Sequence, residues 1–400
     1  MEKFLKIKYW LIVPAIISLF FLISCSDDPT SIGNKLIPGK DRLNTEVIDS
    51  KTGAFDQSFT SFQKDSLYYG SSNRLLLGKY ENISSEALIS FLILLPDSTK
   101  EQLENSEINL ISSWIEIYPN YWIGDSSNFS FTAHKINIPW NSIEVNEDTV
   151  NEIHSSIGPD IIDSFDYTAG DTVIKFSLPD DLMNDWVGRA YDDSFPENYG
   201  VLLAPNTGNG IVGFQGLANF PSYLFPKLFL LFEKPGEFID TVLSNPKLDI
   251  HLPVGDRLIE PSNEIILQSS INVRGKLKFD LSTVPTDVIV NSALLEFFID
   301  EPFSFEGTVK SDTIAVSFFQ NASTDSITTS FGRYPITKSD DKYSGEIRQF
   351  VQRWLDGEPN EGLEVKLSDE SRSASAIYLY SSTHPDESLR PRLTIYYSIK

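Results

Sequence analysis

One stretch of the sequence combines aromatic rings with polar side chains as sugar-binding sites do. Tyr121 and Trp122 follow an expected strand and a proline, and Asn120 precedes them. Asp125 comes three residues after Trp122. Aromatic faces stack on the C–H surfaces of sugars, and amide or carboxylate groups can bond the hydroxyls. The stretch is therefore the candidate ligand-binding site if the rings are exposed. Packing of both rings beneath the edge of the sandwich is nevertheless the favoured interpretation.

The only cysteine of the chain, Cys25, stands where a lipid could be attached. Lysines at three nearby positions and a long apolar run precede it. The sequence Leu-Ile-Ser-Cys that ends at Cys25 resembles the bacterial lipobox, in which the cysteine is diacylated and becomes the new N-terminus. Residues 1–24 are therefore expected to be a lipoprotein signal peptide, with a single transmembrane anchor as the alternative. Because no second cysteine is present, no internal disulfide can form.

The residues after Cys25 predict a tether. Residues 25–40 are rich in Pro, Gly, Ser and Asp, and the tether is expected to extend to residue 50. In some Gram-negative groups, acidic residues directly after the lipidated cysteine send the protein to the outer face of the outer membrane, and Asp27 and Asp28 resemble that signal. Residues 25–40 are also similar to the start of an uncharacterised family of outer-membrane lipoproteins. These resemblances imply a surface-exposed protein whose lipid anchors it to the outer membrane.

The rest of the sequence lacks motifs of catalysis or of nucleic-acid binding. The four histidines occur in no metal-binding or nucleophile spacing; they are His134, His154, His251 and His384. The full chain carries a net charge of −24, and removal of the leader, with its three lysines and one glutamate, leaves −26. Such a surface repels nucleic-acid phosphates and acidic polysaccharides. Neither enzyme activity nor a cofactor nor a nucleic-acid partner is therefore expected.

Two acidic loops carry enough oxygen atoms for a calcium ion. They are Asp192-Asp193-Ser194 and Ser339-Asp340-Asp341. Calcium prefers such oxygen ligands, but neither loop has a known ligand spacing. Solvated surface is the favoured interpretation, and a calcium site is the alternative.

A helix–turn–strand unit that occurs twice organises the remaining sequence. Each copy places apolar residues at helical spacing, as Leu182, Met183, Trp186 and Val187 in the first and Ile347, Phe350, Val351, Trp354 and Leu355 in the second. Ser344 is the candidate N-cap of the second helix, and Gly357 can end it. Because Trp186 and Trp354 lie within the apolar stripes, we expect both to be buried structural residues rather than sugar platforms.

The remaining pattern predicts an all-β fold. Alternating runs of four to eight residues, punctuated by Gly, Pro, Asn and Asp, are typical of antiparallel sandwiches. Five landmarks recur in the same order in both halves, which indicates a duplication. We expect two tandem jelly-roll-like β-sandwich modules, each with one short helix, at residues 51–235 and 236–400. The Pro235-Gly236 turn marks the expected boundary.

The second half is similar to a known family of bacterial modules. The matching segments are 274–281, 284–285, 291–295, 351–357, 360–363 and 390–395. Together they resemble the DNRLRE-type domain, a β-sandwich appended to many bacterial surface and secreted proteins, and the first half is a more distant copy. The naming motif is not intact, because residues 383–390 read THPDESLR. Some relatives are assigned as carbohydrate-binding modules, including binders of acidic algal polysaccharide, so the resemblance implies carbohydrate binding. The acidic charge disfavours that particular ligand.

These observations predict a non-catalytic surface lipoprotein that binds a glycan or another cell-surface component. One alternative is a structural or assembly protein of the cell envelope whose partners are proteins. A polysaccharide-degrading enzyme is less favoured. The 56 carboxylates of the chain make it impossible to single out a glycosidase pair from sequence.

Overall fold

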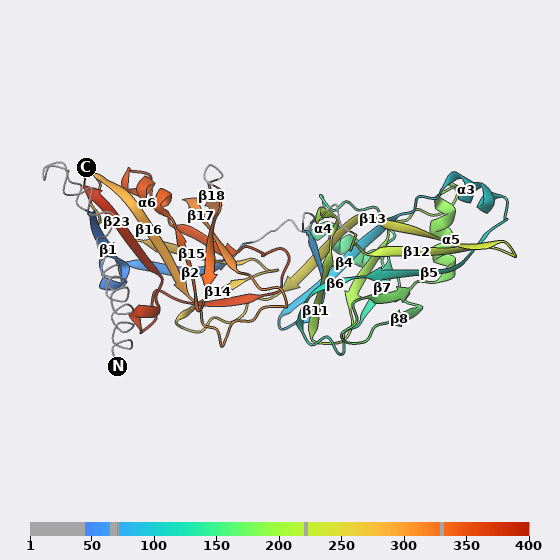
Figure 1. Ribbon diagram of the computed structural model, residues 1–400, viewed down its shortest axis with the longest axis horizontal. Coiled ribbons are helices and arrows are strands. Elements are labelled where there is room, and N and C mark those ends of the chain that lie inside the picture. The colour runs from blue at the N-terminus through green and yellow to red at the C-terminus, as the bar shows by residue number, and fades with distance from the viewer. Residues whose placement is uncertain (1–44, 65–69, 71, 220–222, 329–331, 400) are drawn as a thin grey trace, which may run out of the picture.

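The computed structural model describes residues 45–64, 70, 72–219, 223–328 and 332–399. Cys25, the expected signal peptide and most of the expected tether lie outside these residues. The described chain forms two β-sandwich modules joined end to end (Figure 1). The sheets are antiparallel, so the predicted all-β fold is confirmed.

Module one consists of residues 72–255. Its strands are β3 (Arg74–Tyr80), β4 (Ile83–Leu92), β5 (Asn109–Ile117), β6 (Pro119–Gly124), β7 (Phe131–Lys135), β8 (Ser164–Asp166), β9 (Ile174–Ser177), β10 (Val201–Pro205), β11 (Gly210–Gln215), β12 (Lys227–Lys234) and β13 (Phe238–Gly255). Its helices are α3 (Asp97–Glu104), α4 (Glu147–Ser156) and α5 (Asp180–Arg189). The expectation of one short helix is therefore wrong for this module. The sequences of α3 and α4 bury few apolar residues, so their helical stripes are weak.

Module two combines residues 45–64 with residues 264–399. Its strands are β1 (Thr45–Asp49), β2 (Gln57–Gln63), β14 (Glu264–Gln268), β15 (Val273–Phe279), β16 (Val288–Phe298), β17 (Thr313–Asn321), β18 (Ser326–Ile327), β19 (Tyr334–Ser339), β20 (Lys342–Glu346), β21 (Leu363–Leu367), β22 (Ala376–Tyr380) and β23 (Arg392–Ile399). One helix, α6 (Arg348–Leu355), closes its core.

The two tryptophans of the repeated unit are buried, as their spacing predicts. Trp186 of α5 lies in the core of module one, and Trp354 of α6 lies in the core of module two. Ile347, not Ser344, occupies the N-cap position of α6. The candidate cap Ser344 is part of β20, because that strand continues directly to the helix.

The two modules repeat the same strand pairings. β10 pairs with β4 as β21 pairs with β15, and β12 pairs with β5 as β23 pairs with β16. The turns before β10 and β21 share the same asparagine hydrogen bond. Asn198 donates to the carbonyl oxygen of Phe91 (3.3 Å), and Asn360 donates to that of Phe279 (2.7 Å). Gly200 and Gly362 follow with φ values of 88° and 87°, which only glycine adopts readily.

Each module is completed by a strand or strands from the other half of the sequence. In module one, β13 pairs first with β12 and then with β4. In module two, β1 and β2 take the equivalent positions, because β1 pairs with β23 and β2 pairs with β15. Residues 45–63 therefore precede module one in sequence but complete module two.

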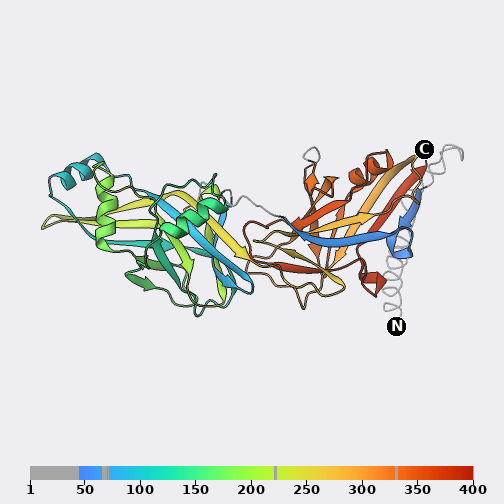
Figure 2. The same cartoon turned by 180° about the vertical axis from the view of Figure 1, so that it is seen from behind.

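This exchange changes the expected module boundaries. Pro235-Gly236 lies in the hairpin turn between β12 and β13, inside module one, and not between modules. The expected tether, residues 25–50, includes β1. Both views show β1 beside β23 at the end of module two that is remote from module one (Figures 1 and 2).

Candidate functional site

The predicted ligand site around Tyr121 is instead part of the junction between the modules. Tyr121 lies on β6 and is 0% exposed. Its hydroxyl oxygen accepts a hydrogen bond of 3.0 Å from the backbone N–H of Ala374 in module two. A Cβ atom at Gly307 would lie 2.4 Å from the ring, so the backbone of module two packs directly against it. The ligand-site hypothesis requires Tyr121 to be exposed, and it is wrong for this residue because module two covers the edge strand β6.

Trp122 is half-buried in module one. Its indole meets Phe129 edge-on at 5.2 Å and stacks on Tyr167 at 5.9 Å. Its backbone carbonyl oxygen accepts a hydrogen bond of 2.7 Å from Thr308 of module two. Both the ring and the backbone of Trp122 therefore make contacts within the protein, and the favoured interpretation, in which these aromatics pack beneath an edge, describes the structure.

The two predicted polar partners have separate structural tasks. Asn120 accepts a hydrogen bond of 3.1 Å from the Nε of Arg74, whose guanidinium lies 4.9 Å from the ring centre of Tyr121. Asp125 is exposed and accepts hydrogen bonds of 2.8 Å from the backbone and hydroxyl of Ser127, which lower the pKa of its carboxyl. Asn120 thus helps to hold Arg74 beside Tyr121 at the junction, whereas Asp125 stabilises its own turn.

A different surface of module one presents aromatic rings to solvent. Trp114 of β5 and Phe229 of β12 are cross-strand partners on the outer face of the sheet. Their rings stack with centroids 4.9 Å apart and planes within 7°. Both are half-buried, since their inner neighbours on the same strands fill the core. Among the stacked aromatic pairs in the part of the chain that the structure describes, these two rings lie closest together and most nearly parallel.

Polar groups surround the platform. Glu116 accepts hydrogen bonds from the Nε1 of Trp114 (2.9 Å) and from the hydroxyl of Tyr118 (2.5 Å). Burial raises the pKa of the Tyr118 hydroxyl, and the bond to Glu116 adds to this shift. Lys175 lies 4.4 Å from the ring centre of Trp114, and Lys227 lies 5.4 Å from that of Tyr118.

We call the outer surface of β5, β9 and β12, with Trp114, Glu116, Tyr118, Lys175, Lys227 and Phe229, the aromatic face. Because β5 lies between β12 and β9, Phe229 and Lys175 cover opposite sides of the indole. Lys175 is exposed, so its long side chain can move aside and uncover that face of the indole. Trp114 is not among the predicted site residues. Its alternation with buried Ser113 and Ile115 was the signal that places it outward.

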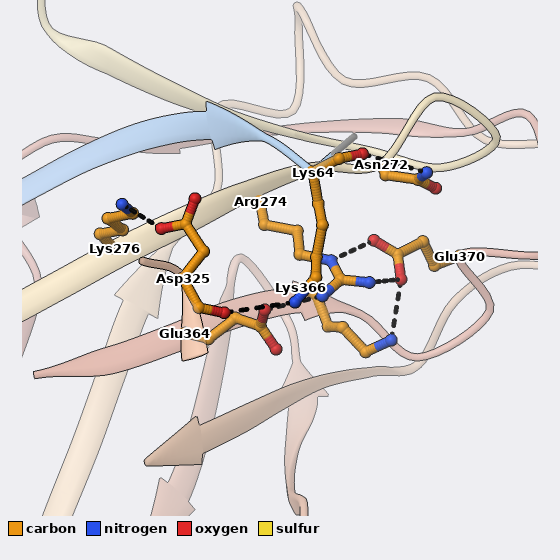
Figure 3. A network of polar contacts seen from close by, with 8 residues as sticks. All are labelled: Lys64, Asn272, Arg274, Lys276, Asp325, Glu364, Lys366 and Glu370. Carbon is orange, nitrogen blue, oxygen red and sulfur yellow. Dashed lines mark hydrogen bonds and ion pairs between the residues drawn. The ribbon is translucent and has the colours of Figure 1, made fainter. Parts of the chain in front are cut away.

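A buried network of four charges lies in module two (Figure 3). Arg274 donates to Glu364 (2.7 Å) and in bidentate fashion to Glu370 (2.6 and 2.7 Å). Lys366 donates to Glu370 at 2.8 Å. Two cations balance two anions, so the network holds no excess charge for a ligand. It fixes the turn after β21, where the carbonyl oxygens of Ser371 and Arg372 accept hydrogen bonds from module one.

The two candidate calcium loops do not converge on a cation site. Asp192 accepts a hydrogen bond of 2.8 Å from the backbone N–H of Ser194, and Asp193 pairs with Arg189 at 3.2 Å. Within the part of the chain that the structure describes, no three His, Cys, Asp or Glu side chains are grouped so that they could hold a metal ion.

Comparisons with known proteins leave the family of this chain open. No family model matches it, and no curated protein matches its sequence. A solved structure described as "Complete structure of manganese lipoxygenase of Gaeumannomyces graminis and partial structure of zonadhesin of Komagataella pastoris" is 10% identical, with a TM-score of 0.17, and the match covers 83% of this chain and 84% of that chain. A TM-score this low does not support a shared fold or function. The DNRLRE resemblance stays a prediction.

Among the described residues, the helices are all too short or too polar to cross a membrane.

Proposed function

We propose that this chain is a non-catalytic lipoprotein of the outer membrane that binds a neutral glycan through its aromatic face. The observation that supports this most is the stacked pair of Trp114 and Phe229, beside Glu116 and the Tyr118 hydroxyl. Aromatic surface with a few placed polar groups is what sugar recognition needs.

In this proposal a sugar ring takes the place of Lys175 over the indole of Trp114. Lys175 is exposed, so its displacement costs little. Glu116 then accepts hydrogen bonds from sugar hydroxyls, and the released ammonium group of Lys175 donates to others. One platform of this size gives weak binding, on the order of high-micromolar to millimolar Kd. Many anchored copies on one cell surface compensate through avidity.

The net charge supports a neutral rather than an anionic polymer. The chain at −24 repels polyanions over distances of about one Debye length, roughly 8 Å at physiological ionic strength. Two lysines on the aromatic face offset this only locally, since Glu116 lies between them in the strand register.

The position of the anchor supports an outward orientation. A lipid at Cys25 would precede β1, which lies at the end of module two remote from module one. The tether then holds module two near the membrane and directs module one away from it. The aromatic face would therefore be presented at the distal end, where extracellular glycans are accessible.

Affinity electrophoresis tests the proposal. The mature chain with Cys25→Ser is run in gels that contain neutral β-glucan, xylan or galactomannan and in gels with anionic alginate or pectin. We expect retardation in at least one neutral gel, loss of it in Trp114→Ala, and retention of it in the control Tyr223→Ala, whose ring is 87% exposed elsewhere. Unchanged retardation in Trp114→Ala, or mobility unaffected by every neutral polymer, would refute the proposal.

A further inference from the structure

The first half of β13 is an edge strand with one free side. Residues 238–244 pair with β12, and the pairing with β4 begins only at Asn245. On the other side of residues 238–244, the described part of the chain supplies no strand. The β12–β13 hairpin projects at the end of module one that is farthest from module two (Figure 1).

The backbone of this edge faces outward at alternate residues. The N–H of Thr241 donates to the side chain of Asp240 at 2.8 Å, as an N–H directed away from β12 can. By the alternation of an antiparallel pair, Ile239 and Leu243 present their N–H and C=O groups on the same side. Ile239 and Leu243 thus offer their N–H and C=O groups to a further strand, and Thr241 offers its C=O group, while its N–H would exchange Asp240 for the new strand.

The side chains of the edge are unusually apolar for an exposed strand. Phe238, Ile239 and Leu243 are 40%, 60% and 53% exposed. Edge strands are normally protected by charges, prolines or short length. Residues 238–244 carry a single charge, Asp240, within a chain whose net charge is −24.

The equivalent edge strand of module two is protected in the ordinary way. β1 is five residues long and carries two carboxylates. Glu46 accepts a hydrogen bond from Tyr397, and Asp49 accepts one from Arg392. The two edges occupy the same place in two copies of one fold, so the apolar character of β13 is not a requirement of the fold.

We propose that two copies of this protein associate through antiparallel pairing of residues 238–244. A two-fold axis at Thr241 places Thr241 opposite itself. Ile239 of one copy then lies opposite Leu243 of the second copy, and these residues lie on one face of the sheet. The sequence is therefore self-complementary about this axis, and Asp240 faces Val242 rather than a second carboxylate.

The dimer continues an existing sheet. The order β13–β12–β5–β9–β8 would extend across the axis into the same five strands of the second copy. Leu243 is also the cross-strand neighbour of Phe229, so the two aromatic faces would lie on one surface. The inference does not depend on glycan binding, because backbone pairing and apolar contact carry it.

The described chain begins at β1, which lies at the opposite end of the molecule from the hairpin (Figure 1). Because β13 runs along the long axis of the molecule (Figure 1), antiparallel pairing directs the module-two ends of the two copies away from each other, so the pairing joins copies that are anchored in facing membranes. Repulsion between the acidic copies opposes the dimer, so salt should strengthen it.

Sedimentation and cross-linking test the dimer. The mature chain with Cys25→Ser is centrifuged at low salt and in about 0.5 M NaCl, where charge repulsion is screened. We expect a monomer–dimer equilibrium that shifts toward dimer in salt. Leu243→Lys and Thr241→Pro should raise the dissociation constant at least about tenfold. Neither change removes a β12–β13 hydrogen bond, and circular dichroism with thermal unfolding verifies that both variants fold.

A single introduced cysteine gives an independent readout, because Cys25 is the only native cysteine. Thr241→Cys, placed on the axis, should form an intermolecular disulfide under mild oxidation. Ser98→Cys, exposed on α3 of the same module, is the matched control and should form far less. A monomer at all salt and protein concentrations, or a dimer indifferent to both edge variants and to the cysteine position, would overturn the proposal.

Discussion

The backbone N–H of Ala374 donates a hydrogen bond of 3.0 Å to the hydroxyl oxygen of Tyr121 across the junction of the two modules. Burial raises the pKa of this hydroxyl, so it stays protonated. Ala374 belongs to the turn that the buried pair of Arg274 and Glu370 holds in place. The junction therefore depends on an aromatic ring from one module and on an ion-pair network inside the other.

Tyr121→Phe should weaken this junction. The change keeps the ring but leaves the N–H of Ala374 buried without an acceptor, which costs about 1–3 kcal/mol. Thermal unfolding of the full mature chain measures the loss. Tyr223→Phe is the control and should be neutral, because that residue is 87% exposed. Equal stability of the two variants would mean that the hydroxyl does not contribute to the junction.

Arg274→Ala should destabilise module two strongly. It leaves Glu364 and Glu370 buried with only Lys366 to compensate them, and breaking a buried pair costs about 3–5 kcal/mol. Urea unfolding provides the measurement. Arg189→Ala, which removes exposed ion pairs in module one, should cost less than about 1 kcal/mol. The role assigned to the network fails if the two variants lose similar stability.

The stability of module two should fall as pH rises from about 4.5 to about 7. Burial raises the pKa of Glu264 from 4.5 to about 7, and a hydrogen bond with Asp300 adds to the shift. The folded protein therefore binds a proton that the unfolded chain releases above about pH 4.5. This stabilisation is complete below pH 4.5 and is lost as pH approaches 7.

Glu264→Gln tests this dependence, since glutamine keeps a similar shape without titrating. The melting temperature of the wild type, relative to that of Glu264→Gln, should be higher at pH 4.5 than at pH 8. Glu237→Gln, at an exposed position in the β12–β13 turn, serves as the control. A constant difference between wild type and Glu264→Gln over this range would contradict the prediction.

Local patterns predicted much of the fold. The apolar spacing around Trp186 and Trp354 predicted two helices with buried tryptophans, and the recurrence of this helix–turn–strand unit indicated a duplication. Strand pairing is not local, so the exchange of β2 and β13 could not be read from sequence. In the sequence, a Pro-Gly turn after a strand has the same pattern whether it closes a hairpin or marks a boundary between modules.

The candidate site was less predictable for the same reason. Tyr121 and Trp122 follow a proline, a pattern that also suits an exposed loop, and only the contacts of Tyr121 with Gly307 and Ala374 bury its ring. The alternating strand that contains Trp114 is evident from the sequence, but its cross-strand partner Phe229 lies more than a hundred residues away. An aromatic platform formed by strands that are distant in the sequence has no characteristic residue spacing by which it could be predicted.

The lipid anchor is testable without any structure of the leader. Cys25→Ala should leave the precursor uncleaved or release the protein from the membrane, because diacylation requires the thiol. Mass spectrometry of the mature N-terminus from the membrane fraction is the measurement. An unmodified Cys25 in that fraction would contradict lipid anchoring and, with it, the proposed orientation of module one.

Phe59→Ala should destabilise module two although residue 59 precedes all of module one in the sequence. Phe59 of β2 is buried in the core of module two and lies 5.5 Å from Phe297, ring centre to ring centre. Truncation of such a core aromatic costs about 3–5 kcal/mol. Trp354 is the only tryptophan of module two, so fluorine NMR of the fluorotryptophan-labelled mature chain resolves its unfolding from that of module one. With Phe59→Ala, the Trp354 signal should report unfolding at lower urea, while the signals of Trp114 and Trp186 keep their midpoints. Val212→Ala, in the core of module one, should produce the opposite pattern. If Phe59→Ala shifts the tryptophans of module one instead, β2 does not belong to module two, and the strand exchange is wrong.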